Sequence, residues 1–292
     1  MNDSLFDAHA HVYTDDVARY PVNVRNSFLP EEELLRRVRT HPVTDEHLLA
    51  LWDEAGVAAG AGVQYSSIYK TDNSYLLDCA DRHPDRVSAV VILDAIDPAT
   101  PARLATLVVE RGVAGLRLTG GATGAGNYPW LESEAALATW RVAADHGLPV
   151  VIMYTPRGPT PAAIERIAAV ARRFPDLPVV LDHLGWPGVD AATGGPAAEI
   201  LPLIDIATVV FKATSINFRL LAEQGIDVPR FIRRFADLVG AERMMWGSDY
   251  GNTVQTFPDM AAQARAAAGE LTHAERRRFL HDTGRGIFFR AR

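Results

Sequence analysis

Val90-Val91-Ile92-Leu93 is a continuous apolar run, and it is followed by a helical pattern over Pro101–Arg111, by Gly112 and by a new apolar run from Val113. A strand that is apolar on both faces is typical of a parallel sheet covered by helices on each side. A glycine directly after a helical pattern is typical of a helix C-terminus. The stretch therefore predicts one strand–helix–strand unit of an α/β protein.

The same unit recurs along the whole chain. The apolar runs that predict strands begin near Leu5, Val57, Val87, Val113, Pro149, Pro178, Ala207 and Arg243. The helical patterns between and after them cover Thr44–Ala55, Asn73–His83, Pro101–Arg111, Trp130–His146, Pro161–Phe174, Pro196–Ile204, Val228–Val239 and Met260–Ala268. Eight strands that alternate with helices predict the α/β class and a single-domain (β/α)₈ TIM barrel over residues 1–292.

Three further segments complete this prediction. Residues 13–43 and 186–196 are long connections after strands, at the C-terminal mouth of the barrel, where such loops often form lids. The segment 272–292 is expected to hold an extra C-terminal helix over Thr272–His281 and a tail, with Thr272 as N-cap.

A doubly wound open sheet is the alternative architecture. Such a sheet usually carries a glycine-rich phosphate loop after an early strand, and no G-x-G-x-x-G pattern follows the first strand here. The glycine-rich stretch Gly120–Gly126 follows the fourth strand, and we interpret it as a flexible active-site loop. The barrel is therefore the better prediction.

Composition excludes several classes of protein. The chain of 292 residues has a net charge of −7, which disfavours nucleic acid as a partner. No apolar run is long enough for a membrane span, and no signal peptide is recognisable. The single cysteine, Cys79, excludes an internal disulfide framework, so we expect a cytoplasmic protein. The barrel helices leave both a monomer and a homo-oligomer open.

Polar side chains stand at most of the predicted strand ends, which converge on one site in a (β/α)₈ barrel. In chain order the residues at these ends are His9, His11, Gln64, Tyr65, Asp94, Arg117, Met153, Tyr154, His183, Lys212 and Asp249, of which only Met153 is apolar. His9 and His11 are two residues apart on a strand, so their imidazoles point to the same face. Each residue alone also has a structural interpretation, such as an N-cap for Asp249, a turn cap for Asp182 or an ion pair for Arg117. Together they favour a catalytic site.

The motifs Phe6–His11, Val179–Pro187 and Met245–Tyr250 together resemble the amidohydrolase superfamily. Residues 63–77 and Gly115-Leu116-Arg117-Leu118 resemble its amidohydrolase-related branch, amidohydrolase family 2, which includes 2-pyrone-4,6-dicarboxylate lactonase and sugar-acid lactonases. The resemblance covers nearly the whole chain. It implies a hydrolase and a site on a barrel mouth.

Two departures from the family pattern bear on the cofactor and on the substrate. Met153 stands where metal-dependent members usually place a histidine, and a thioether is a poor zinc ligand. The resemblance therefore implies either no required cofactor or one weakly held divalent ion, zinc, on His9, His11 and Asp249. Trp186 stands near a position where related lactonases often carry a basic residue, which suggests a substrate with fewer carboxylates or a more aromatic one.

The leading hypothesis is hydrolysis of a lactone of a small carboxylic or sugar acid. Asp249 acts as general base on a water, while His9, His11 and His183 polarise the carbonyl as donors or through a cation. The residues expected to contact the small, anionic substrate are Arg117, Tyr154, Tyr65, Arg219 and Trp186.

Two rival functions remain at this stage. A metal-dependent, non-oxidative decarboxylase of an aromatic or muconate-type acid shares the His-x-His pair and the terminal aspartate. A non-catalytic small-molecule binding protein on a barrel scaffold is the rival from another class.

Overall fold

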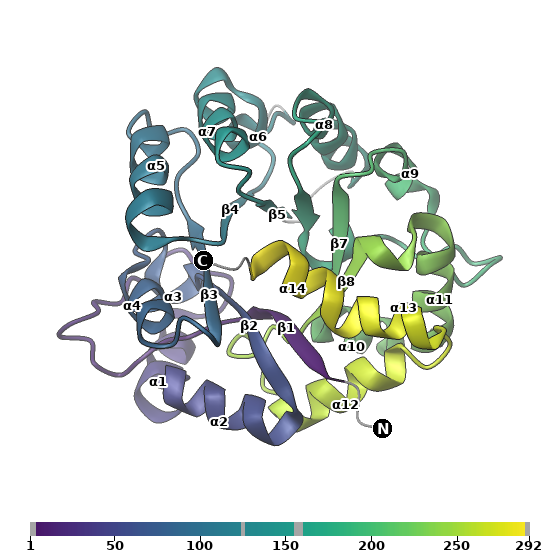
Figure 1. The fold of residues 1–292 in the computed structure, drawn as a ribbon, viewed down its shortest axis with the longest axis horizontal. Helices are drawn as coiled ribbons and strands as arrows, with labels where there is room; N and C mark the ends of the chain where they lie inside the picture. The colour runs from purple at the N-terminus through teal and green to yellow at the C-terminus, as the bar shows by residue number, and fades with distance from the viewer. Residues whose placement is uncertain (1–3, 124–125, 155–159, 290–292) are drawn as a thin grey trace.

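The computed structural model describes residues 4–123, 126–154 and 160–289 and is a nearly closed barrel of eight parallel strands, paired in chain order (Figure 1). The strands are β1 (Leu5–Ala10), β2 (Val57–Val63), β3 (Val87–Ile92), β4 (Gly115–Gly120), β5 (Val150–Tyr154), β6 (Val179–Leu181), β7 (Val209–Thr214) and β8 (Met244–Gly247). Their order confirms the predicted (β/α)₈ barrel. Part of the expected glycine-rich loop, Gly124 and Ala125, lies outside the described residues, as do residues 290–292 of the expected tail.

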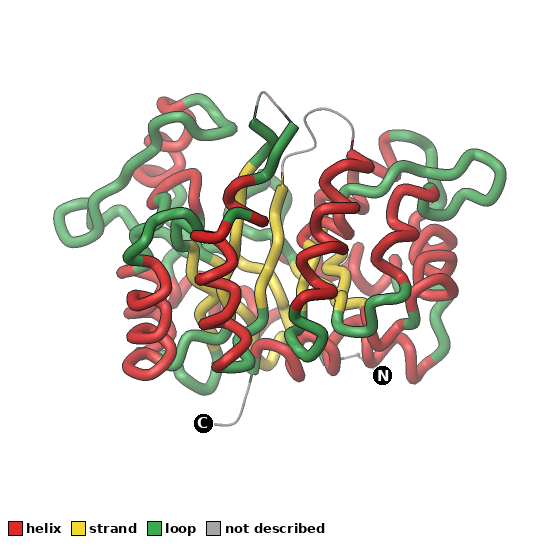
Figure 2. The backbone as a smooth tube through the Cα atoms, turned by 90° about the horizontal axis from the view of Figure 1, so that it is seen from above, coloured by secondary structure: helices red, strands yellow, loops and turns green. Residues whose placement is uncertain are grey.

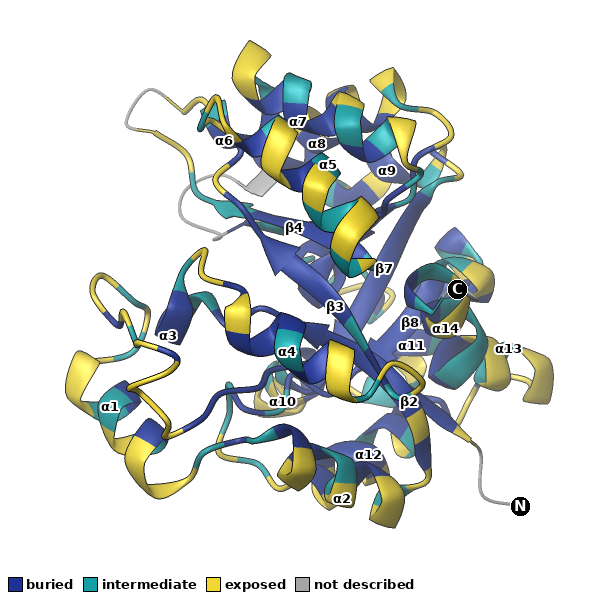
Figure 3. Cartoon of the chain, turned by 60° about the vertical axis from the view of Figure 1, so that its left-hand side comes forward, coloured by how far each residue is buried: buried dark blue, intermediate teal, exposed yellow. Residues whose placement is uncertain are grey.

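Helices surround the strands, with exposed outer faces and buried inner faces (Figures 2 and 3). They are α1 (Glu31–Thr40), α2 (Asp45–Ala55), α3 (Ser66–Tyr69), α4 (Ser74–Arg82), α5 (Thr100–Arg111), α6 (Pro129–Glu132), α7 (Glu134–Asp145), α8 (Thr160–Arg173), α9 (Leu201–Ile204), α10 (Ser215–Glu223), α11 (Val228–Val239), α12 (Phe257–Ala267), α13 (His273–Arg277) and α14 (Thr283–Phe288). No helix in the described part of the chain is long and apolar enough to cross a membrane.

The structure corrects the predicted helices at several places. The pattern over Trp130–His146 is two helices, because Ser133 has extended backbone and its hydroxyl caps α7 by accepting from the Ala136 N–H. The long connection after β1, for which the sequence predicts no helix, contains α1. Helix α1 is largely charged and buries only Leu34 and Val38, so few apolar residues mark it in the sequence.

The N-terminal end of the barrel interior is apolar. Its buried cluster consists of Phe6, Ala8, Ala59, Ala61, Val63, Val90, Val151, Val180, Val210, Met245 and Phe288. Helix α14 lies across this end in Figure 1, and Gly284 of α14 sits against Phe6 and Ala8, where a Cβ would lie 2.9 Å from Phe6. The C-terminal helix therefore closes the bottom of the barrel.

The seam between β1 and β8 closes the barrel at its C-terminal end. The Asp249 N–H donates to the His9 carbonyl at 2.7 Å, and the His11 N–H donates to the Tyr250 carbonyl at 2.9 Å. Gly247 faces His9 so closely that a Cβ would lie 2.5 Å from the His9 Cβ. The backbone hydrogen bonds that close the barrel thus involve His9, His11 and Asp249, whose side chains are also the candidates for catalysis.

Candidate active site

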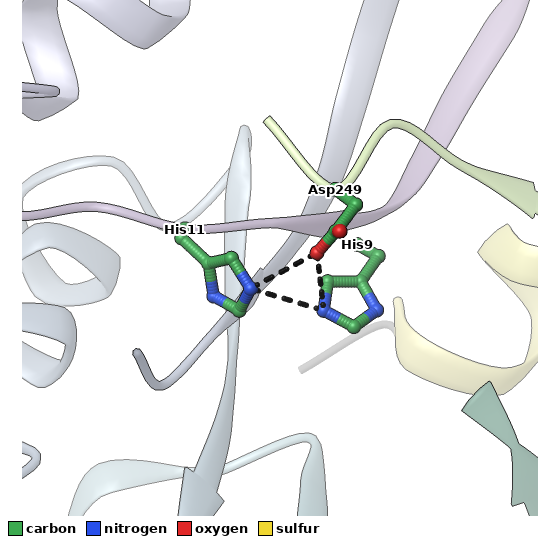
Figure 4. A group of neighbouring side chains, drawn as sticks. All are labelled: His9, His11 and Asp249. Carbon is green, nitrogen blue, oxygen red and sulfur yellow. Dashed lines mark hydrogen bonds and ion pairs between the residues drawn. The ribbon is translucent and has the colours of Figure 1, made fainter. Parts of the chain in front are cut away.

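His9, His11 and Asp249 form one buried cluster at the seam (Figure 4). Asp249 Oδ1 lies 3.2 Å from His11 Nε2 and 3.5 Å from His9 Nε2, and the two Nε2 atoms are 3.3 Å apart. The pairing register of β1 with β2 is irregular between Asp7 and Ala10. This irregularity lets His9 point inward although its neighbour Ala8 also belongs to the interior cluster.

The tautomer of His11 follows from its backbone partner. His11 Nδ1 lies 2.8 Å from the Val63 carbonyl oxygen, which can only accept, so Nδ1 carries a hydrogen. In the neutral ring Nε2 then presents its lone pair to Asp249 Oδ1. Two acceptors at this distance repel unless a proton or a cation lies between them. The centre of the cluster therefore favours the binding of a proton or a cation.

The three side chains fit a divalent ion. Each offers one ligand atom, and these atoms lie within 4.8 Å of one another. Imidazole nitrogen and carboxylate oxygen are ordinary zinc ligands, and three protein ligands are the usual number in a catalytic site. Met153 is not part of this group, and its sulfur faces the Thr119 hydroxyl at 3.9 Å.

The interpretation of Asp182 as a turn cap is wrong. Its carboxylate lies inside the barrel, with Oδ2 at 2.7 Å from Arg117 Nε and Oδ1 at 2.9 Å from Lys212 Nζ. Oδ1 also lies 3.4 Å from His9 Nδ1. Asp182 thus joins side chains from three other strands, β1, β4 and β7, in a cluster that is closed to solvent.

Arg117 was expected to grip a substrate carboxylate, and the structure gives it an internal partner instead. Its side chain is only 6% exposed and its Nε is committed to Asp182. Lys212, for which structural and functional roles were evenly weighed, is fully buried, and its ammonium lies over the Phe288 ring. Lys212 and Arg117 therefore share the single carboxylate of Asp182 as their counter-charge.

Burial and charge shift the ionisation of this cluster. Burial lowers the pKa of His9 to about 3, although Asp182 opposes the shift. Burial acts to raise the pKa of Asp182, but Lys212 and Arg117 hold that pKa well below its ordinary value. Burial also acts to raise the pKa of Asp249, but the neighbouring His11, His9 and His183 rings hold that pKa well below its ordinary value. Asp249 is therefore a carboxylate at neutral pH.

His183 and Trp186 lie in a turn directly after β6. The His183 ring is 5.8 Å from the His9 ring and 4.5 Å from the Trp186 ring, and Trp186 is half-buried. The Tyr154 hydroxyl donates to the Gly185 carbonyl in this turn. Tyr154 was expected to donate to the substrate, and in the structure its hydroxyl supports the turn instead.

Tyr65 lies on the opposite side of the cluster. Its ring stacks on the His11 ring at 4.6 Å, and its hydroxyl donates to Asn252 Oδ1 at 3.0 Å. The Asn252 amide in turn donates to Asp249 Oδ2 at 3.0 Å. One aromatic ring thus packs against an imidazole on each side, Tyr65 on His11 and Trp186 on His183.

Arg219 is the one expected substrate contact that the structure does not bring to the site. It lies on α10 with a side chain that is 45% exposed, and it pairs with Glu223 one turn away at 2.8 Å. Its sequence position after the seventh strand suggested a place at the mouth. Helix α10, which the sequence analysis did not predict, carries it outward instead.

Asp7 and Ser248 support the site and were missed by the sequence analysis. Asp7 accepts from the Ser248 N–H at 2.8 Å, the Ser248 hydroxyl at 2.6 Å and the His9 N–H at 3.0 Å. This clamp joins the residues directly before Asp249 to the strand that carries His9. The signal was present in the motif, since a charged residue in an otherwise apolar strand needs a buried partner.

Comparison with known proteins decides the family. The amidohydrolase family model matches residues 6–290. The chain belongs to the amidohydrolase family. The resemblance to family 2 that the sequence motifs predicted is therefore confirmed.

Two curated relatives of this amidohydrolase act on sugar-acid lactones according to their names. The L-fucono-1,5-lactonase of Burkholderia ambifaria is 26% identical over 250 residues, which is 84% of this chain and 79% of the relative. The D-galactarolactone isomerase of Agrobacterium fabrum is 26% identical over 233 residues, which is 77% of this chain and 75% of the relative.

Solved structures share the fold at lower identity. A probable 2-pyrone-4,6-dicarboxylic acid hydrolase from Acinetobacter baumannii has a TM-score of 0.71 at 19% identity, over 99% of each chain. A 2,6-dihydroxybenzoate decarboxylase from Rhizobium has a TM-score of 0.69 at 16% identity, over 99% of this chain and 98% of the other. At such identity the likeness establishes the barrel and does not choose between the two reactions.

Proposed function

We propose that this amidohydrolase opens the lactone of a small carboxylic or sugar acid by hydrolysis. The observation that carries the proposal is the ionised, buried Asp249 carboxylate, which faces two imidazole nitrogens at the barrel mouth. The lactone-related names of both curated relatives support the choice of substrate class.

Asp249 is the general base in this mechanism. It takes a proton from a water, the water oxygen adds to the lactone carbonyl carbon, and the bond from that carbon to the ring oxygen breaks. The proton then passes to the ring oxygen, so the product is a hydroxy acid. General-base catalysis of this kind contributes about 10²–10⁴ in rate. Asn252 orients the carboxylate through its bond to Oδ2.

The imidazole nitrogens of His9 and His11 face the centre of the site, where negative charge develops on the carbonyl oxygen. A divalent ion held by His9, His11 and Asp249 would supply Lewis-acid polarisation of that carbonyl. His183 faces the same centre from β6, and burial lowers its pKa, so it acts as a neutral ring. Asp182 lies 3.4 Å from His9 Nδ1 and helps to fix the orientation of the His9 ring.

The aromatic rings on either side of the cluster fit a small substrate with a flat or pyranose-like ring. Tyr65 and Trp186 offer apolar faces beside the imidazoles. Because Arg117 is buried and its Nε is paired with Asp182, we assign it no role in holding an anionic substrate.

A hydrolysis screen tests the proposal. Purified enzyme is offered aldonolactones, uronic-acid lactones and pyrone carboxylates, and proton release is recorded with and without a chelator. We expect turnover of at least one lactone class. Binding of lactones without any product would instead indicate a small-molecule binding protein.

A metal-dependent decarboxylase is the second candidate, favoured by the three convergent donor atoms of His9, His11 and Asp249. It differs from a lactonase in its product, because it releases carbon dioxide from a hydroxybenzoate or muconate-type acid. Carbon dioxide release that depends on a stoichiometric metal, with no lactone turnover, would establish it.

A further inference from the structure

The turn after β6 has an unusual backbone. His183, Leu184, Gly185 and Trp186 have φ angles of 54°, 58°, 72° and 54°, so four consecutive residues are left-handed and three of them carry a Cβ. Residues other than glycine normally visit this region singly, since a Cβ is crowded by the carbonyl oxygen there. A run of this kind persists only where surrounding contacts hold it.

The turn places two neighbouring side chains on the same side. Asp182 continues the inward alternation of Val180 and points into the barrel. The next residue of an extended strand would point outward. The left-handed turn brings His183 back toward the interior, where its ring lies near the His9 ring.

Asn217 on α10 holds this turn. Its side chain is buried, and Nδ2 donates to the His183 carbonyl at 2.9 Å. Oδ1 accepts from the Thr214 N–H at 3.0 Å. These two bonds fix the orientation of the amide, because the reversed amide would set acceptor against acceptor and donor against donor.

Thr214 connects Asn217 to the His183 ring. The Thr214 hydroxyl oxygen lies 3.2 Å from Asn217 Oδ1 and 2.7 Å from His183 Nδ1. A hydroxyl has one proton to donate. When Thr214 donates it to the fixed Oδ1 acceptor, its oxygen accepts the Nδ1–H of His183. The Nε2 atom of His183 is then left as a lone pair.

We propose that Asn217 is a positioning residue that holds the left-handed turn and, through Thr214, keeps the proton of neutral His183 on Nδ1. His183 then acts in the site as an acceptor at Nε2, for a water proton or a cation, and not as a donor to the carbonyl. This role rests on the proposed function only in taking the site as catalytic. The proton position itself is a property of the resting protein.

Nitrogen-15 NMR of histidine-labelled, chelator-treated protein at pH 7.5 tests the proposal without any substrate. The His183 signals are assigned by their loss in His183→Gln. We expect the Nδ1–H tautomer in the native protein and in Thr214→Ser, which keeps the hydroxyl. In Asn217→Ala the threonine hydroxyl loses its acceptor and donates to His183 Nδ1 instead, so we expect a change to the Nε2–H tautomer.

Asn73→Ala is the matched control. Asn73 is equally buried and bridges backbone groups, donating to the Ile92 carbonyl and accepting from the Ile92 N–H at 2.9 Å each, but it touches no site residue. We expect a similar loss of stability and an unchanged His183 tautomer. With a substrate in hand, Asn217→Ala is expected to lower kcat on the order of 10²-fold, as displaced catalytic groups do, and Asn73→Ala to leave it unchanged.

An Nε2–H tautomer of His183 in the native protein, or an Nδ1–H tautomer retained in Asn217→Ala, would overturn the proposal. Should Asn217→Ala fail to fold, Thr214→Val serves in its place, because it removes the hydroxyl at constant shape. Retention of the native His183 signals in Thr214→Val would be equally contradictory. An enzyme that hydrolyses no lactone but has the expected tautomers would refute only the proposed function.

Discussion

The two ends of the barrel interior obey different rules. The N-terminal end is filled by apolar side chains and closed by Phe288 of α14, as an ordinary protein core is. The C-terminal end holds two carboxylates, an ammonium, a guanidinium and three imidazoles, all buried: Asp182, Asp249, Lys212, Arg117, His9, His11 and His183. The first end contributes stability through packing alone. The second end positions the candidate catalytic side chains, and its stability depends on each buried charge keeping its partner.

Removing the central charge should damage the polar end most. Asp182→Asn leaves Lys212 and Arg117 without their counter-charge, so we expect the free energy of unfolding to fall by about 3–5 kcal/mol. Adding Lys212→Met to this variant should recover part of the loss, because it removes one unpaired charge. Urea unfolding measures both effects. A double variant less stable than Asp182→Asn would contradict this electrostatic account.

Opening the apolar end should cost as much stability without touching the chemistry. Phe288→Ala removes a buried ring from the barrel bottom, and we expect a loss of about 3–5 kcal/mol. Below the unfolding transition kcat/KM should stay at the native level. A variant that is folded but inactive would show that the two ends are coupled through Lys212, whose ammonium lies over this ring.

Acid should weaken the polar end through His9. The pKa of His9 is about 3 in the folded protein because of burial, and about 6.5 in the unfolded chain. The unfolded state therefore binds the extra proton, and stability present above pH 6.5 is lost as the pH falls. Relative to His9→Gln, chelator-treated native protein should lose about 2 kcal/mol between pH 6.5 and pH 5. Parallel stability curves for the two proteins would contradict the neutral state of His9.

The smallest effect concerns backbone strain at Trp186. With φ of 54°, this position should favour glycine over alanine, so Trp186→Gly is expected to be about 1–2 kcal/mol more stable than Trp186→Ala. Exposed Val109 on α5 is the control, because glycine should be worse than alanine inside a helix. The same order of stability at both positions would argue against strain in the turn.

The sequence predicted the features that follow from recurring apolar runs and from the alternation of side chains along a strand. Continuous apolar runs placed all eight strands, and their shared ends brought His9, His11 and Asp249 together before any coordinates. The period of a strand also contained the position of Asp182, two residues after Val180. An aspartate directly after a strand also fits a turn cap, so the sequence alone did not assign Asp182 to the interior.

Other features were outside the reach of a single sequence. The left-handed turn at His183 depends on Asn217, which lies far along the chain and approaches only in the folded barrel. The partner of Arg117 likewise comes from another strand, so its charge looked free. Helix α10 directs Arg219 away from the mouth. Its apolar pattern is short, so the sequence did not predict this helix.

The variant Asp249→Asn tests the proposed role of Asp249 as general base. With a lactone identified by the screen, kcat and the dissociation constant are measured on the native enzyme and the variant, the latter by calorimetry. We expect kcat to fall about 10²–10⁴-fold while the dissociation constant changes little, since the amide keeps the shape of the carboxylate and loses only its basicity. Native turnover by a correctly folded Asp249→Asn enzyme would contradict the account.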